Sequence, residues 1–176
     1  MPNVSVVNLI LMLPASGVDI SGRNDLWATL ERGSRAIERW YQAQGERVLM
    51  VQPEMVCQDF DLGDLNPWSE VRTHLGARGC DFDVADPAVP NRRLEQYLVY
   101  LAGWQPATPV AAHGGMGLAV IGEAWYALTK QGEDGQDTAN AIAAHEIGHS
   151  LYGDTHNPDP AKLMSLGAKP LSMQSL

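Results

Sequence analysis

Two apolar stretches separated by a long amphipathic segment open the chain. Residues 4–13 are rich in Val, Ile and Leu and predict a buried strand that ends at Pro14. In residues 24–44 apolar side chains recur at helical spacing, which predicts a helix ended by Gly45. Residues 47–56 predict a second strand. A strand, a helix and a strand in this order indicate two parallel strands covered by the helix.

The middle of the chain has a less regular pattern. Residues 66–76 predict a helix, because Asn followed by Pro is a favourable start and Gly a plausible end. Residues 91–103 predict a further helix with leucines on one side, again ended by Gly. Residues 106–115 predict a loop. Residues 118–128 contain two apolar runs around a glycine, which predicts a hairpin or one kinked strand.

A last helix is expected near the C-terminus. Residues 131–136 predict a polar turn, after which Asp137 or Thr138 can cap a helix over residues 139–152. Its alanines make it compact and easy to bury. The tail, residues 157–176, is rich in Pro, Gly and Ser and is too short for another domain. The pattern therefore predicts an α/β (α+β) protein with a small mixed sheet, a covering helix and an irregular C-terminal part.

Composition narrows the class of partner. The length of 176 residues fits one domain, and 45% hydrophobic with 19% charged residues is typical of a globular protein. A net charge of −9 argues against nucleic acid or an anionic membrane surface and slightly favours neutral or basic peptides. The longest apolar stretch is too short to span a bilayer and lacks the features of a signal peptide. Cys57 and Cys80 permit one disulfide without requiring it.

Two histidines and a glutamate stand close together in the last predicted helix. His145 and His149 are four residues apart, so on a helix they share one face, about 6 Å apart along the axis. Imidazoles placed in this way can bind one Zn²⁺. Glu146 lies roughly 100° further round, where it can accept a proton from a zinc-bound water. Because unpaired histidines and a glutamate in a buried helix would be costly, the pattern favours a zinc site over surface or capping histidines.

A third zinc ligand is expected shortly after these histidines, since catalytic zinc has three protein ligands and one open position. Gly153 can end the helix in a left-handed conformation and turn the chain back, which favours His156 as that ligand. Asp154 and Asp159 are alternatives, because carboxylates also bind zinc. Met164 is expected either to form an apolar floor beneath the metal or to pack in the core.

Residues 145–156, followed by Met164 between Leu and Ser, resemble the zinc motif and Met-turn of the metzincins, particularly the matrixins and serralysins. The close match covers about twenty residues. One feature departs from the family pattern H-E-x-x-H-x-x-G-x-x-H. Three residues instead of two separate His149 from Gly153, so His156 follows His149 by seven residues. A bulge at Tyr152 or a repacked turn can absorb the extra residue, since the spacing from the glycine to the histidine is retained; otherwise Asp154 or Asp159 would supply the third ligand.

The resemblance implies a zinc-dependent endopeptidase of one catalytic domain, residues 1–176, with subdomains at about 1–149 and 150–176. It implies that residues 114–120 form an edge strand that pairs with an extended peptide substrate, although a plain core strand is equally compatible. Residues 165–170 would line a substrate pocket. A monomer is expected, exported by resemblance to the family, with a cytoplasmic location as the alternative.

Two other functions stay open. The chain could be a zinc peptidase of another class, with a Glu or Asp of a separate helix as third ligand. It could also be a non-catalytic zinc-binding module that keeps the motif helix. A Ca²⁺ site is a further hypothesis for the acidic residues Asp59, Asp61, Asp64 and Glu70, but the order of Gly and Asp is reversed there, and a solvated acidic loop is favoured. His74 and His113 are expected to be structural or exposed.

Overall fold

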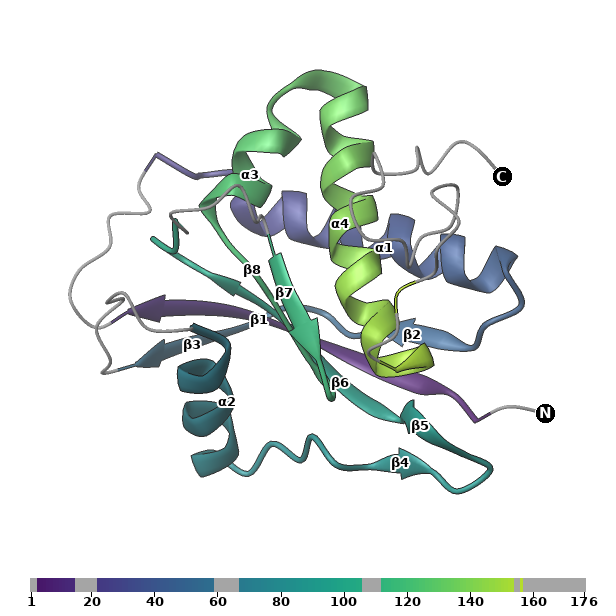
Figure 1. Cartoon of the computed structure of the whole chain (residues 1–176). Coiled ribbons are helices and arrows are strands. Elements are labelled where there is room, and N and C mark those ends of the chain that lie inside the picture. The colour runs from purple at the N-terminus through teal and green to yellow at the C-terminus, as the bar shows by residue number, and fades with distance from the viewer. Residues whose placement is uncertain (1–2, 15–21, 59–66, 106–111, 154–155, 157–176) are drawn as a thin grey trace.

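A mixed β-sheet lies between two layers of helices in the computed structural model, which describes residues 3–14, 22–58, 67–105, 112–153 and 156 (Figure 1). The strands follow the order β2-β1-β6-β8-β7, and β3 pairs with the distal part of β1. Within this sheet, neighbouring strands run parallel except β7 and β8, which are antiparallel. The strands are β1 (Ser5–Pro14), β2 (Val48–Met50), β3 (Glu54–Gln58), β6 (Glu95–Leu101), β7 (Ala112–Gly115) and β8 (Leu118–Ile121).

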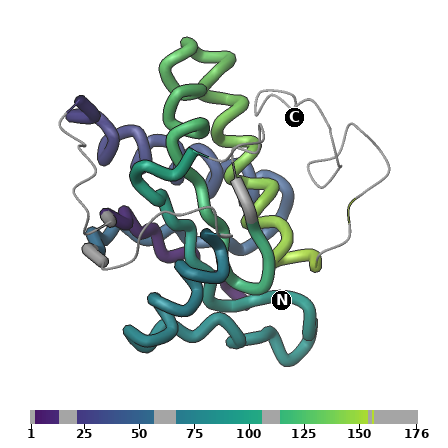
Figure 2. The backbone as a smooth tube through the Cα atoms, turned by 60° about the vertical axis from the view of Figure 1, so that its left-hand side comes forward, coloured from purple at the N-terminus to yellow at the C-terminus, as the bar shows by residue number. Residues whose placement is uncertain are grey.

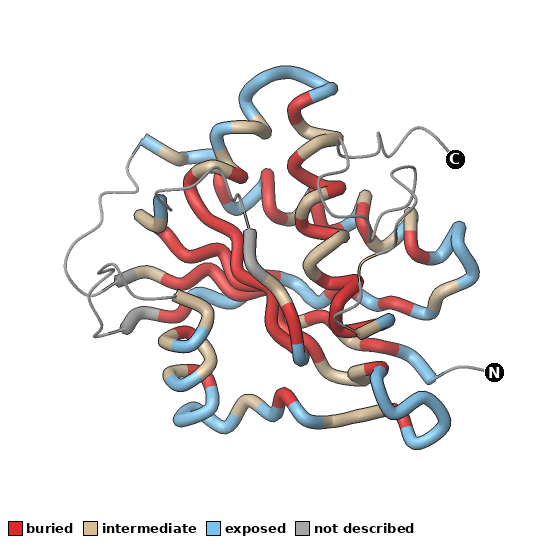
Figure 3. The backbone as a smooth tube through the Cα atoms, viewed as in Figure 1, coloured by how far each residue is buried: buried red, intermediate tan, exposed pale blue. Residues whose placement is uncertain are grey.

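Within the described ranges, four helices cover the two faces of this sheet. They are α1 (Leu26–Ala43), α2 (Pro67–Ala77), α3 (Glu123–Thr129) and α4 (Gly132–Tyr152). Side chains of α1, α3 and α4 share one buried cluster with the sheet, whereas Val71 and Leu75 of α2 belong to the cluster on the other face. Buried residues are concentrated along the central strands and in α4 (Figure 3). No described helix is long and apolar enough to cross a membrane.

The front of the chain confirms the predicted strand–helix–strand unit. Strand β1 and helix α1 lie where the pattern placed them, and Gly45 follows the helix with φ +83°. The single strand predicted over residues 47–56 is instead two segments, β2 and β3, and both run parallel to β1. Pro53 lies between them and has no amide hydrogen to donate to the ladder.

The helix predicted over residues 91–103 is wrong. This region forms β5 (Val89–Arg93), which pairs with the short β4 (Ala85–Asp86), and then the central strand β6. Both faces of β6 are buried, with Tyr97 and Val99 on the α2 side and Leu98 and Tyr100 on the α1 and α4 side. A strand buried on both faces is apolar throughout, so its two-residue period is hidden.

Three boundaries in the C-terminal half also differ from the prediction. The loop predicted to end at residue 115 contains β7, and residues 106–111 lie outside the described part. The apolar runs of residues 118–128 are a strand and a helix, β8 and α3, joined at Gly122, where a Cβ atom would lie 2.6 Å from the Trp104 carbonyl oxygen. Helix α4 begins at Gly132, and Glu133 and Asp134 in its first turn suit the helix dipole.

Candidate metal centre

Helix α4 is held firmly against the core on the side away from its histidines. Ala143, Ala144 and Ile147 are buried in the cluster shared with α1 and the sheet. The Tyr41 hydroxyl of α1 donates to the Ala144 carbonyl at 2.5 Å, and the Trp125 indole of α3 donates to the Ala139 carbonyl at 2.8 Å. These buried hydrogen bonds fix the position of α4 along its axis, so the motif residues have a defined place relative to the sheet.

The three predicted histidines lie together. His145, His149 and His156 each present a ring nitrogen, and these nitrogens lie within 4.8 Å of one another. Ring centroids are 4.9 Å apart for His145–His149, 5.4 Å for His145–His156 and 4.8 Å for His149–His156. Zinc–nitrogen bonds of about 2.1 Å need ligand nitrogens roughly 3.4 Å apart in a tetrahedral site, so small ring movements suffice. The donor set therefore fits a zinc ion.

The neighbourhood of His149 suits a metal ligand. Its side chain is buried, and Nδ1 lies 3.4 Å from the Gly153 carbonyl oxygen. In the tautomer that carries the proton on Nδ1, this carbonyl orients the ring and Nε2 keeps its lone pair for a metal. The backbone just beyond the helix thus supports the ring of the second motif histidine.

The extra residue of the motif is absorbed without a bulge. Helix α4 continues through Tyr152, and Gly153 follows with φ 88° and ψ 178°, a conformation open essentially to glycine alone. Its amide donates to the His149 carbonyl at 3.0 Å. His156 then lies beside the other two rings. Asp154 and Asp159, the alternative ligands, lie outside the described residues.

The Glu146 side chain lies where α4 meets β7, and the two elements run alongside each other in both views (Figures 1 and 2). A Cβ atom on Gly114 would lie 2.6 Å from Glu146 Oε2 and 2.7 Å from both its Cβ and its carbonyl oxygen. Burial raises the pKa of Glu146 to about 7, and a hydrogen bond from the Gly114 backbone acts in the opposite direction. Only glycine allows this approach of strand to helix.

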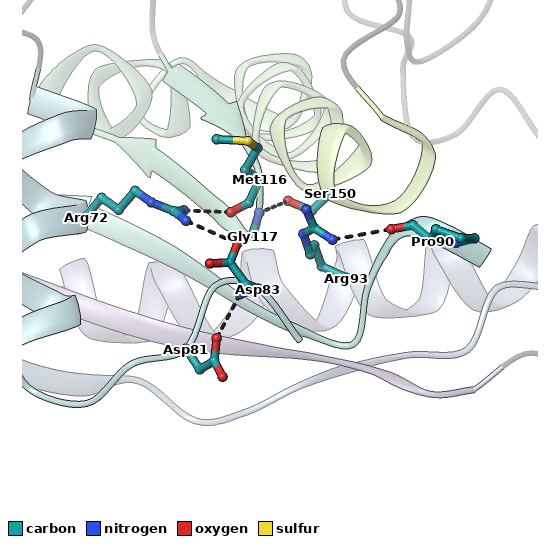
Figure 4. A network of polar contacts seen from close by, with 8 residues as sticks. All are labelled: Arg72, Asp81, Asp83, Pro90, Arg93, Met116, Gly117 and Ser150. Carbon is teal, nitrogen blue, oxygen red and sulfur yellow. Dashed lines mark hydrogen bonds and ion pairs between the residues drawn. The ribbon is translucent and has the colours of Figure 1, made fainter. Parts of the chain in front are cut away.

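The β7–β8 hairpin is tied to two helices (Figure 4). Its turn residues Met116 and Gly117 have φ of 44° and 84°, the signature of a type I′ hairpin. The buried Ser150 hydroxyl of α4 accepts the Gly117 amide at 2.9 Å, and Arg72 of α2 donates to the Met116 carbonyl at 2.8 Å. The sequence placed Gly114 in the candidate substrate strand but did not indicate its contact with Glu146, and it indicated no separate role for Ser150. The double glycine at residues 114–115 was the signal for a close approach.

The segment predicted to pair with substrate, residues 114–120, divides between two strands. Gly114 and Gly115 belong to β7 at the edge of the sheet, whereas Leu118 begins the inner strand β8, which pairs with β6 and β7. Only the β7 part is thus placed to accept a further strand.

Several other predicted features remain untested. Met164, residues 165–170, and the acidic residues Asp59, Asp61 and Asp64 lie outside the described part, so the Met-turn and the Ca²⁺ site stay predictions. Glu70 lies in α2. Cys80 is a half-buried free thiol, and the side chain of Cys57 is not described. His74 lies on α2, across the sheet from α4, and His113 lies in β7.

Comparison with known proteins gives likeness of fold only. No protein-family model matches the chain, and no curated protein matches it. Archaemetzincin from Methanopyrus kandleri is similar with a TM-score of 0.50 and 15% identity, over 94% of this chain and 87% of that chain. A chain from a chaperone–substrate complex has a TM-score of 0.55 and 12% identity, over 94% of this chain and 28% of that chain.

Metalloproteinase-II from Bacteroides fragilis is similar with a TM-score of 0.45 and 11% identity, over 98% of this chain and 52% of that chain. This score is too low to show a shared fold. The small mixed sheet, the helices that cover it and the likeness to archaemetzincin together show that the chain has a metzincin-like mixed α/β fold.

Proposed function

We propose that the chain is a zinc-dependent endopeptidase that hydrolyses internal peptide bonds of extended protein or peptide substrates. The observation that carries this proposal is the cluster of His145, His149 and His156, whose ring nitrogens lie within 4.8 Å of one another. Three imidazoles are a ligand set of catalytic zinc, which keeps its fourth position for water or substrate. The metzincin-like fold supports the same conclusion.

Glu146 would act as the general base. Zinc, when bound, would polarise the scissile carbonyl and lower the pKa of its water towards about 7. Glu146 follows the first candidate ligand on the helix, and its carboxylate lies against the edge strand β7. From there it would accept the proton of the attacking water and pass it to the leaving amine.

Strand β7 would align the substrate. It is the last strand in the sheet order, so its outer backbone edge is not paired with any strand of the described residues. An extended peptide can add to such an edge through backbone hydrogen bonds, which bind substrates of varied sequence. The strand also contacts Glu146 through Gly114, so a peptide bound at β7 would pass close to the base.

Cleavage of an unstructured protein such as casein by the zinc-loaded chain tests the proposal. We expect cleavage at internal bonds, and its loss in Glu146→Ala with zinc still bound in equimolar amount. Glu133→Ala is the matched control, because Glu133 lies in the first turn of the same helix, far along the chain from the histidines. Equal cleavage by Glu146→Ala, or no cleavage by the wild type, would overturn the proposal. Zinc binding without cleavage would favour the non-catalytic module.

A further inference from the structure

A pocket of about 280 Å³ opens beside His149 at the end of α4. The last turn of the helix forms one wall, with Ser150 and Tyr152. Met116, at the β7–β8 turn, forms another wall. Asn91 and Arg93 of β5 complete the lining. The pocket therefore joins a candidate zinc ligand, the end of the candidate substrate-binding strand and one positive charge.

Arg93 differs from its neighbour Arg92 in having no carboxylate partner among the residues that the structure describes. Arg92 is buried and forms an ion pair with Glu46 at 2.5 Å. Consecutive residues of a strand point to opposite faces, so Arg93 points away from that pair. Its Nη1 donates only to the Pro90 carbonyl at 3.3 Å, and its Nε is buried without an acceptor among the described residues (Figure 4).

We propose that this pocket binds a carboxylate of the substrate, the side chain of an Asp or Glu, and that Arg93 selects it; the inference rests on the proposed peptidase function. A guanidinium binds a carboxylate through charge-assisted hydrogen bonds, often two in parallel. The Asn91 side chain can add a neutral donor.

The hairpin geometry indicates which part of the substrate reaches the pocket. A peptide that pairs antiparallel with β7 begins near Met116 and runs towards Ala112. Glu146 contacts the strand at Gly114, so the scissile bond lies near that point. The acidic side chain therefore lies on the N-terminal side of the scissile bond.

The overall charge of −9 does not oppose this selection. Charges separated by more than about 8 Å are largely screened at physiological ionic strength, so a direct pair with Arg93 outweighs the distant acidic residues. The nearby carboxylate Glu46 is already neutralised by Arg92 and accepts the Tyr152 hydroxyl at 3.2 Å. At this pocket the local charge thus favours an acidic side chain, whereas the net charge of the chain slightly favours neutral or basic peptides.

Cleavage of matched peptides tests the role of Arg93 in the active enzyme. The peptides are acetylated and amidated at their ends. They form pairs in which a single Glu or Gln occupies, in turn, each position before the cleaved bond. We expect the wild type to cleave the best Glu peptide about tenfold faster in kcat/KM than its Gln counterpart, the effect of one charge-assisted contact. Arg93→Gln should abolish this ratio, because cleavage of the Glu peptide should slow about tenfold more than cleavage of the Gln peptide. Arg39→Gln, an exposed arginine on α1, is the matched control and should keep the ratio.

Binding separates this inference from the peptidase proposal. The same peptides are titrated into zinc-loaded Glu146→Ala, with and without Arg93→Gln, by calorimetry. Tighter binding of the Glu peptide that depends on Arg93 supports the pocket assignment even if the wild type cleaves nothing. Equal binding of Glu and Gln peptides, no binding of either, or a charge preference that survives Arg93→Gln would overturn it.

Discussion

Replacing Gly114 by alanine should damage both the fold and the site through one contact. The added Cβ atom would lie 2.6 Å from Glu146 Oε2 and 2.7 Å from the Cβ and the carbonyl oxygen of the same residue. The carboxylate can rotate away, but the other two atoms belong to the rigid part of α4. Restoring an ordinary contact of 3.4 Å to these two atoms, now at 2.7 Å, requires β7 and α4 to separate by about 0.7 Å.

Two magnitudes follow from that separation. Overpacking of this kind costs about 1–3 kcal/mol of stability, which urea unfolding of the zinc-free chain would measure. A displacement of about 0.7 Å between the base and the substrate strand is expected to lower kcat/KM by up to about a hundredfold. The cost is steric, because Gly114 is not in the left-handed region.

Gly76→Ala is the matched control for this prediction. Gly76 lies in α2, and a Cβ atom there would meet only Phe82 Cε2, at 4.0 Å. Since alanine favours helix over glycine, this variant should be stabilised by up to about 1 kcal/mol with unchanged activity. If Gly114→Ala were as stable and as active as the wild type, the close approach of β7 to α4 would be refuted.

Four further outcomes are expected. Ser150→Ala leaves the Gly117 amide buried without its acceptor and should cost about 1–3 kcal/mol in urea unfolding; a loss below about 0.5 kcal/mol would contradict the anchoring of the hairpin. In Gly153→Ala, a residue with a Cβ atom must adopt φ 88° and ψ 178°, so the free energy of unfolding should fall by about 1–3 kcal/mol. The end of the helix should loosen as a result, which a chelator competition would detect as weaker zinc binding. A chelator should abolish activity and lower the melting temperature until zinc is restored. His156→Ala should weaken zinc binding by more than about tenfold, whereas the control His74→Ala should leave zinc binding unchanged.

The candidate site could be predicted from the sequence because most of it is local. The spacing of His145 and His149 defines one helix face wherever the helix lies in the fold. Gly153 marks the helix end by its own conformational freedom, without reference to distant residues. The contacts of Gly114 and Ser150 link segments far apart in the chain, and no local pattern indicates which glycine or serine will make them.

The fold was predictable where burial differs between two sides of an element. Helix α1 has one buried face, and its periodicity identifies it. Strand β6 is buried on both sides, and the spacing of Leu94, Leu98 and Leu101 imitates a helix within an apolar run. Its aromatic and β-branched residues favour a strand only weakly. Pairing with the neighbouring strands β1 and β8 determines the conformation of this segment.

Helix α4 links the elements of the proposed site into one unit. It carries two candidate ligands and the candidate base, and Gly114 of β7 lies in close contact with Glu146 on this helix. Ser150, one residue after His149, fixes the β7–β8 turn, and the same turn lines the Arg93 pocket. Because the extra residue lengthens the helix through Tyr152, it leaves these contacts in register and displaces only the exit at Gly153. The seven-residue interval to His156 is therefore compatible with a complete three-histidine site.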